Sequence, residues 1–152
     1  MAYVNDIQTS IEEFLETTAK KLKSISIEDW EAKAAPDKWS RKEILGHLID
    51  SGQTNIRRLI VSQYSQNEKI RYEQNDWVKY NDYQHVAVDE IISLWFLTNK
   101  QYHKISKSIP ADSLDYTCDT GKNGIELVSL RFLIDDYWGH QIHHLKQIFQ
   151  GM

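Results

Sequence analysis

Three histidines stand close together near the end of the chain, in the segment WGHQIHHLKQI that runs from Trp138 to Ile148. His140 and His144 are four residues apart, so on an α-helix they lie about one turn apart on the same face. Their Cβ atoms would then be roughly 5–6 Å apart. Two imidazole nitrogens at that separation can bind one cation at about 2.0–2.1 Å each. The spacing therefore predicts two ligands of a metal site.

The competing interpretation is that these histidines only form hydrogen bonds within a core. A heptad frame over residues 130–147 places His140 and His144 on the inward seam, where leucine or isoleucine would be expected. Two imidazoles on an otherwise apolar seam favour metal binding more strongly than one would. His143 also has ligand spacing from His140, but it falls beside the seam. Geometry therefore favours His144 as the ligand and places His143 at a pocket rim or outward.

A third histidine elsewhere would strengthen the metal interpretation, because catalytic zinc sites often use three protein ligands and a water. His47, in the segment EILGHLIDS, is the best candidate by position. Gly46 and Gly52 flank it and would permit close approach of another backbone or a ligand. His85 falls in a long connection, and His103 falls off the apolar stripe of its segment. From periodicity alone the third ligand stays open.

Helices must position these side chains, and four segments carry apolar residues at three- and four-residue steps. Asn5 or Asp6 could cap the first segment. Ser40 and Glu43 have the spacing of a capping box at the start of the second. Pro110 stops the third, and a TGKNG turn precedes the fourth. The expected helices cover about residues 7–25, 40–60, 88–109 and 125–149.

The overall composition also favours long helices. Only 6 Gly and 2 Pro interrupt the 152 residues. A polar, aromatic-rich connection of about 25 residues, with RYEQNDWVKYNDYQH at its centre, separates the second and third helices. We therefore expect one all-α domain over residues 1–152, a four-helix bundle with one long connection between helices 2 and 3.

Charge and cysteine content exclude several classes of function. The net charge is −4 without a dense Lys/Arg stripe, which argues against nucleic-acid or membrane partners. Cys118 is the only cysteine, so an intramolecular disulfide is impossible; we interpret it as a loop residue rather than a catalytic thiol. The first residues lack the features of a signal peptide. The sequence contains no run of about 18 apolar residues, the length needed to span a membrane. We expect a cytoplasmic protein.

Two histidine-containing segments together resemble a known family. KWSRKEILGHLIDS, followed by Asn55–Leu59, resembles the second helix of the DinB-like superfamily, which includes YfiT-type metal-dependent hydrolases. IDDYWGHQIHHLKQIF resembles its last helix, and YEQNDWV matches a segment found between helices 2 and 3 in one branch. The resemblance implies an up-up-down-down four-helix bundle, commonly a homodimer. It also implies a divalent metal held by His47, His140 and His144.

The resemblance leaves the reaction open, since members include thiol-dependent transferases and isomerases. Three neutral imidazoles leave the full charge of a cation in place. That charge would lower the pKa of a bound water towards about 7, or deprotonate a low-molecular-weight thiol. We expect a metal-dependent transferase or hydrolase acting on a small molecule, with zinc or nickel as the metal, although imidazoles also suit copper or iron. The alternatives are a non-catalytic binding module and a dimeric scaffold with a vestigial site.

Further residues could complete the site. Asp136, Asp50 and Gln147 lie three or four residues from the predicted ligands, and each could orient an imidazole through its other nitrogen; each could equally be a solvated side chain. Aromatic residues of the long connection could wall a pocket over the metal or simply cover the open end of the bundle. The candidates for the substrate pocket are Asn55, Tyr72, Trp77 and His143. No GxSxG or GxxxxGK motif is present, which excludes two large enzyme classes.

Overall fold

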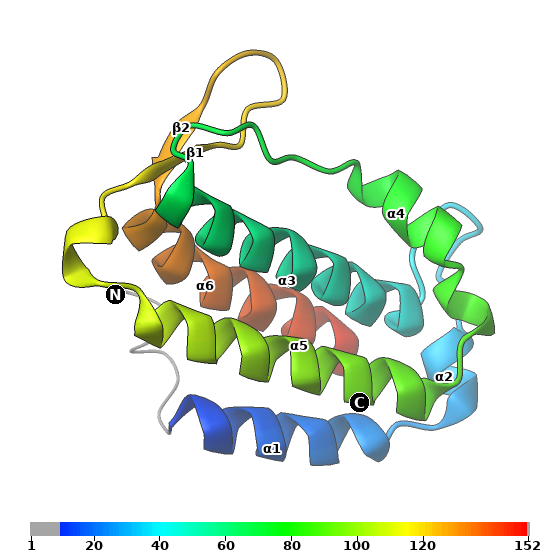
Figure 1. Cartoon of the computed structure of the whole chain (residues 1–152). Helices are drawn as coiled ribbons and strands as arrows, with labels where there is room; N and C mark the ends of the chain where they lie inside the picture. Colours follow the sequence, from blue (N-terminus) through cyan, green and yellow to red (C-terminus); the bar gives the residue numbers. More distant parts are fainter. Residues whose placement is uncertain (1–9, 152) are drawn as a thin grey trace.

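The computed structural model describes residues 10–151, and four long helices dominate them (Figure 1). The all-α four-helix class expected from periodicity is confirmed. None of the described helices is long and apolar enough to cross a membrane. The four helices are α1 (Ile11–Lys23), α3 (Arg41–Tyr64), α5 (Val88–Ser108) and α6 (Leu130–Phe149).

Side-chain caps set the starts of these helices. At α3, the Ser40 hydroxyl accepts a hydrogen bond from the Glu43 backbone N–H, and the Glu43 carboxylate accepts one from the Ser40 N–H. The predicted capping box is therefore confirmed. The caps expected at Asn5 or Asp6 lie outside the described residues, and the structure caps α1 with Ser10 instead.

The helix directions differ from the expected up-up-down-down order. Glu12 at the start of α1 pairs with His103 near the end of α5, so these two helices are antiparallel. Trp95 donates to Gln141 and Tyr102 donates to the Leu133 carbonyl, so α5 and α6 are antiparallel as well. Together with the antiparallel α3 and α6, this gives an up-down-down-up order (Figure 1). Two long crossovers are needed for up-up-down-down. Here only the connection after α3 returns along the bundle, whereas the one after α1 holds the short α2 (Ile27–Glu31) and reverses the chain.

The long connection between α3 and α5 is partly helical, not irregular. It contains α4 (Gln74–Asn81) and the short 3-10 helix η2 (Tyr83–His85). Gly46 of α3 lets this segment pack closely, because a Cβ at that position would lie 2.1 Å from the Tyr83 ring. The connection is thereby held against α3 next to His47.

A small hairpin replaces the expected first turn of the last helix. The helix η3 (Ala111–Ser113) follows α5, and β1 (Thr117–Asp119) then pairs antiparallel with β2 (Leu127–Ser129). The expected start at Ile125 is wrong; Ser129 caps α6, and the apolar residues before it match the helical period by coincidence. Cys118 is buried in β1, not in a loop. The hairpin also holds the chain before Tyr72, since the Ile70 N–H donates to the Asp119 carbonyl at 3.0 Å.

Candidate metal centre

Three imidazoles from two helices converge at one point inside the bundle. His47 comes from α3, and His140 and His144 come from α6. The Nε2 atoms of His47 and His140 are 3.2 Å apart. One ring nitrogen from each of the three lies within 4.8 Å of the others. The structure therefore brings together the three histidines that the heptad and the family resemblance single out.

The distance between two of these nitrogens fits a shared divalent cation. Two ligand nitrogens 3.2 Å apart, each about 2.0–2.1 Å from a shared ion, subtend an angle of about 100° at that ion. This is close to the tetrahedral angle that zinc sites adopt. The ring centroids are similarly close, at 5.1 Å for His47–His140, 4.9 Å for His47–His144 and 4.7 Å for His140–His144.

Each imidazole also has an oxygen next to its other nitrogen. Gln147 Oε1 lies 2.8 Å from His144 Nδ1. A carbonyl oxygen only accepts, so this contact places the proton on Nδ1 and leaves the Nε2 lone pair facing the cluster. The predicted orienting role of Gln147 matches this geometry.

The oxygens next to the other two rings come from residues that sequence reasoning placed elsewhere or missed. The Tyr72 hydroxyl lies 3.3 Å from His47 Nδ1, and Ser51 Oγ lies 3.5 Å from His140 Nδ1. Tyr72 was expected only as a pocket wall. Ser51 was missed, although it follows His47 by four residues and so shares its helix face.

Burial keeps the cluster neutral. It lowers the pKa of His47 to about 3, with the neighbouring His140 and His144 as smaller causes. Burial and the nearby His144 and His143 lower the pKa of His140 to about 4. The pKa of His144 is also lowered, mainly by burial. Neutral imidazole is the form that binds metal, so all three rings hold free lone pairs near pH 7.

Comparison with known proteins identifies the family. The sequence matches the family model of the DinB superfamily over residues 10–148. This chain belongs to the DinB superfamily. No protein of curated function matches it.

Two solved structures resemble this DinB chain. The first is YfiT from Bacillus subtilis, described as a probable metal-dependent hydrolase with an unusual four-helix bundle topology. It has a TM-score of 0.77 and 18% identity, and the match covers 90% of this chain and 81% of YfiT. The second is a mycothiol-dependent maleylpyruvate isomerase, with a TM-score of 0.67 and 10% identity. The match covers 86% of this chain but 55% of the isomerase, so the chain spans about half its length. At these identities the likeness concerns the fold alone.

The two carboxylates expected to orient imidazoles in this DinB chain do not contact them. Asp50 Oδ1 accepts hydrogen bonds from the Tyr83 hydroxyl at 2.6 Å and from Asn81 Nδ2 at 3.0 Å. Asp50 follows His47 by three residues, which turns its side chain towards the α4–η2 segment. Asp136 is exposed, and no hydrogen bond joins it to an imidazole in the described part of the chain. The expectation that Asp50 and Asp136 orient imidazoles is therefore wrong.

The pocket candidates fall into two groups. The ring centroids of Tyr72 and Trp77 are 5.8 Å apart in an edge-to-face contact, and of the two only Tyr72 contacts His47. Asn55 lies farther along α3 and donates to the Ser51 carbonyl at 2.8 Å. His143 is exposed, with its Nε2 3.4 Å from the Gln147 amide.

One further aromatic residue packs against the cluster, whereas two of the remaining histidines lie away from it. The Trp39 ring, which sequence reasoning did not single out, packs 5.1 Å from the His47 ring. His85 and His103 lie away from the cluster, where they contact Asp82 and Glu12.

Proposed function

We propose that this protein is a metal-dependent enzyme in which His47, His140 and His144 hold one divalent cation and leave a position for a reactant. The observation that carries the proposal is the convergence of three neutral imidazole nitrogens within 4.8 Å. A divalent cation held there supplies Lewis acidity, which lowers the pKa of a water or a small thiol. We infer thiol transfer or hydrolysis as the reaction class, with zinc or nickel as the metal.

The protein's own residues would orient the imidazoles. Gln147 and Tyr72 contact the Nδ1 atoms of His144 and His47, and Ser51 lies near that of His140. Such contacts favour one tautomer and restrict rotation of the ring, which keeps each Nε2 directed at the cluster. Trp39 covers one face of His47 and limits the access of water to it.

The alternative is a non-catalytic bundle with a structural or ligand-binding metal. Closed structural sites have four protein ligands. The cluster contains three in the described part of the chain. The two other histidines that could have closed it are exposed: His143 contacts the Gln147 amide, and His85 contacts Asp82. This arrangement supports an open position, and hence an enzyme.

Metal analysis of the purified protein and of a His47→Ala variant tests the proposal. We expect the wild type to bind about one divalent ion per chain, and the variant to lose it with little change in melting temperature. His85→Ala is the matched control and should keep the metal. Unfolding of His47→Ala would indicate a structural site, and a wild type without metal affinity would indicate a vestigial one.

A substrate screen on zinc- and nickel-loaded protein then separates the two reactions. Small thiols paired with electrophilic acceptors test transfer, whereas esters and amides without added thiol test hydrolysis. In either case the activity should disappear in His47→Ala and remain in His85→Ala.

A further inference from the structure

A cavity of about 270 Å³ is lined by Tyr72, whose hydroxyl contacts His47. The outer face of α3, the segment 69–72 and α4 form its walls. Three cationic side chains line it, Arg57, Lys69 and Arg71, together with the aromatic rings of Tyr72 and Trp77. Among its lining residues in the described part of the chain, none is acidic. In a chain with a net charge of −4, such a lining does not follow from composition.

The cations are held from different segments and only partly neutralised. Arg71 pairs with Glu73 at 2.7 Å, and its side chain is 21% exposed. Lys69 Nζ lies 3.5 Å from Asp119 and donates to both the Gly121 and the Gly124 carbonyls, so its three N–H groups have partners and it contributes charge rather than a free donor. Both acids lie outside the cavity lining, so they hold the cations in place without filling the space between them.

Two arginines carry positive charge without an acidic partner among the described residues: Arg57 of the lining and, in addition, Arg58. No ion pair engages Arg57 within residues 10–151. Just behind the cavity wall, Arg58 donates from Nε to the Ile70 carbonyl at 2.9 Å, and no described carboxylate pairs with it. The four cations therefore outnumber the three acids beside them, Glu73, Asp76 and Asp119, by one.

We propose that this cavity binds the carboxylate or phosphate group of a small organic anion. Guanidinium groups bind both groups through paired hydrogen bonds, and the indole and phenol rings offer apolar walls for the rest of the molecule. Tyr72 lines the cavity and also contacts His47. A bound anion therefore lies one side chain away from the cluster. That the anion is a substrate or co-substrate rests on the proposed function, whereas anion binding itself does not.

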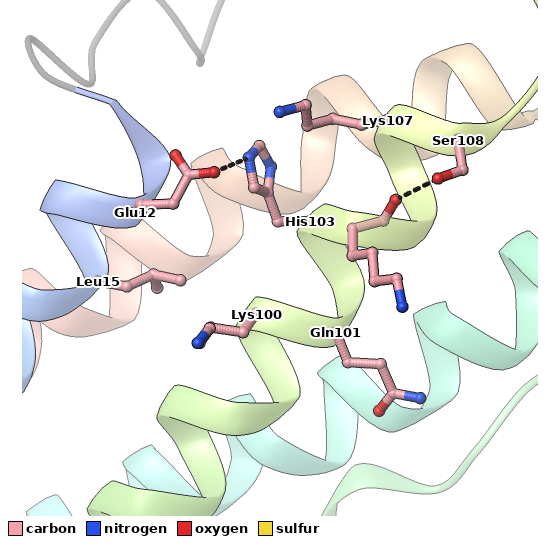
Figure 2. Close-up of a pocket in the computed structure, with 8 residues that line it drawn as sticks. Glu12, Leu15, Lys100, Gln101, His103, Lys107 and Ser108 are labelled. Atoms are coloured by element: carbon pink, nitrogen blue, oxygen red, sulfur yellow. Dashed lines mark hydrogen bonds and ion pairs between the residues drawn. The ribbon is translucent and has the colours of Figure 1, made fainter.

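A second cavity with basic lining residues differs from the proposed anion site and provides a comparison. The cavity in Figure 2, between α1 and α5, is lined by Lys100, Lys104 and Lys107. All three come from the exposed face of α5, and Glu12 pairs with His103 inside this cavity. It therefore combines an acid with flexible lysines on a solvated helix surface, and it serves as the control.

Titration of metal-free protein with sodium phosphate, and separately with sodium succinate, tests the proposal by amide NMR. We expect saturable shifts confined to residues 53–57 and 69–77, with the tighter of the two probes identifying the group. Arg57→Gln should weaken binding about tenfold or more, because it removes a charge-assisted contact. Lys107→Gln removes the same charge elsewhere and should change affinity less than twofold. Binding should also weaken as sodium chloride is added.

The outcomes separate this inference from the proposed function. Equal effects of Arg57→Gln and Lys107→Gln, or shifts that never saturate with either anion, would overturn the anion site. Arg57 is exposed, so its substitution should leave the fold intact. His47→Ala should abolish metal binding but leave the anion affinity unchanged. The two results are thus independent: the anion site can be confirmed in a protein that binds no metal, and it can be refuted in a protein that proves to be a metal enzyme.

Discussion

Replacing Asp50 with asparagine should change how the stability of the protein depends on pH. Asp50 is 0% exposed, and one of its oxygens has no hydrogen-bond partner. Burial raises the pKa of Asp50 to about 6 from its ordinary value of 3.8, although the bond from Tyr83 opposes the rise. The folded protein therefore holds this proton more tightly than the unfolded chain. A difference of about 2 in pKa corresponds to about 3 kcal/mol.

The sign of the effect follows from that difference. Below about pH 4 the carboxyl is protonated in both states, and the full stabilisation is present. As the pH rises from about 4 through 6, the unfolded chain loses its proton first, and the free energy of unfolding falls. The amide of Asp50→Asn never ionises, and its oxygen can still accept the bonds from Tyr83 and Asn81. The variant should thus gain about 3 kcal/mol relative to wild type between pH 4 and pH 7.

Urea denaturation of both proteins at intervals from pH 4 to pH 8, with chelator present, measures this gain. Asp119→Asn is the control. Backbone N–H groups of Glu126 and Gly121 lower the pKa of Asp119, so the pH dependence that this carboxylate contributes lies below about pH 4, and the wild-type and Asp119→Asn curves should run parallel from pH 4 to pH 8. Parallel curves for wild type and Asp50→Asn would refute the reasoning, because they would mean that Asp50 is solvated in the folded protein.

Three other substitutions test the elements that position the site. Gly46→Ala should destabilise the fold by about 1–3 kcal/mol in urea denaturation, because its Cβ would overlap the Tyr83 ring; unchanged stability would mean that η2 is not packed there. Ser40→Ala should lower the free energy of unfolding by about 1 kcal/mol through loss of the α3 cap, measured by thermal melting with a Thr substitution as the control. Gln147→Met should weaken metal binding about 10–100-fold in a chelator competition without altering stability, because it frees Nδ1 of His144; equal affinities would contradict an orienting role.

Periodicity predicted the elements that carry the histidines. The 3.6-residue pattern and the capping box identified α3 and α6, and the heptad frame placed His140 and His144 on one inward face. These features are local, since they depend on residues within a few turns of each other. The third histidine of the cluster, His47, is 93 residues from His140, and only the family resemblance joined it to the other two.

Most of the errors have a common physical cause. The hairpin and the α4 helix depend on pairing between distant segments, which local propensity does not encode, whereas the expected up-up-down-down order came from the family resemblance. Thr117, for instance, pairs with Ser129 across the turn. The same reason explains Asp50, whose partners Asn81 and Tyr83 arrive from the connection after α3. The spacing of Asp50 from His47 suggested an orienting role, but its hydrogen-bond donors come from a different segment of the chain.

The tautomers of the three histidines determine which of their nitrogens can bind a cation. Gln147 fixes the proton of His144 on Nδ1, so its Nε2 can only accept. If the Nδ1–H groups of His47 and His140 likewise donate to Tyr72 and Ser51, the Nε2 atoms of all three rings are acceptors. No donor then lies between them. Three lone pairs within 4.8 Å repel each other unless a cation or a proton lies between them. Burial lowers the pKa of His47 and so opposes a second proton on that ring. In the proposed function, a metal ion is the partner that satisfies all three nitrogens at once.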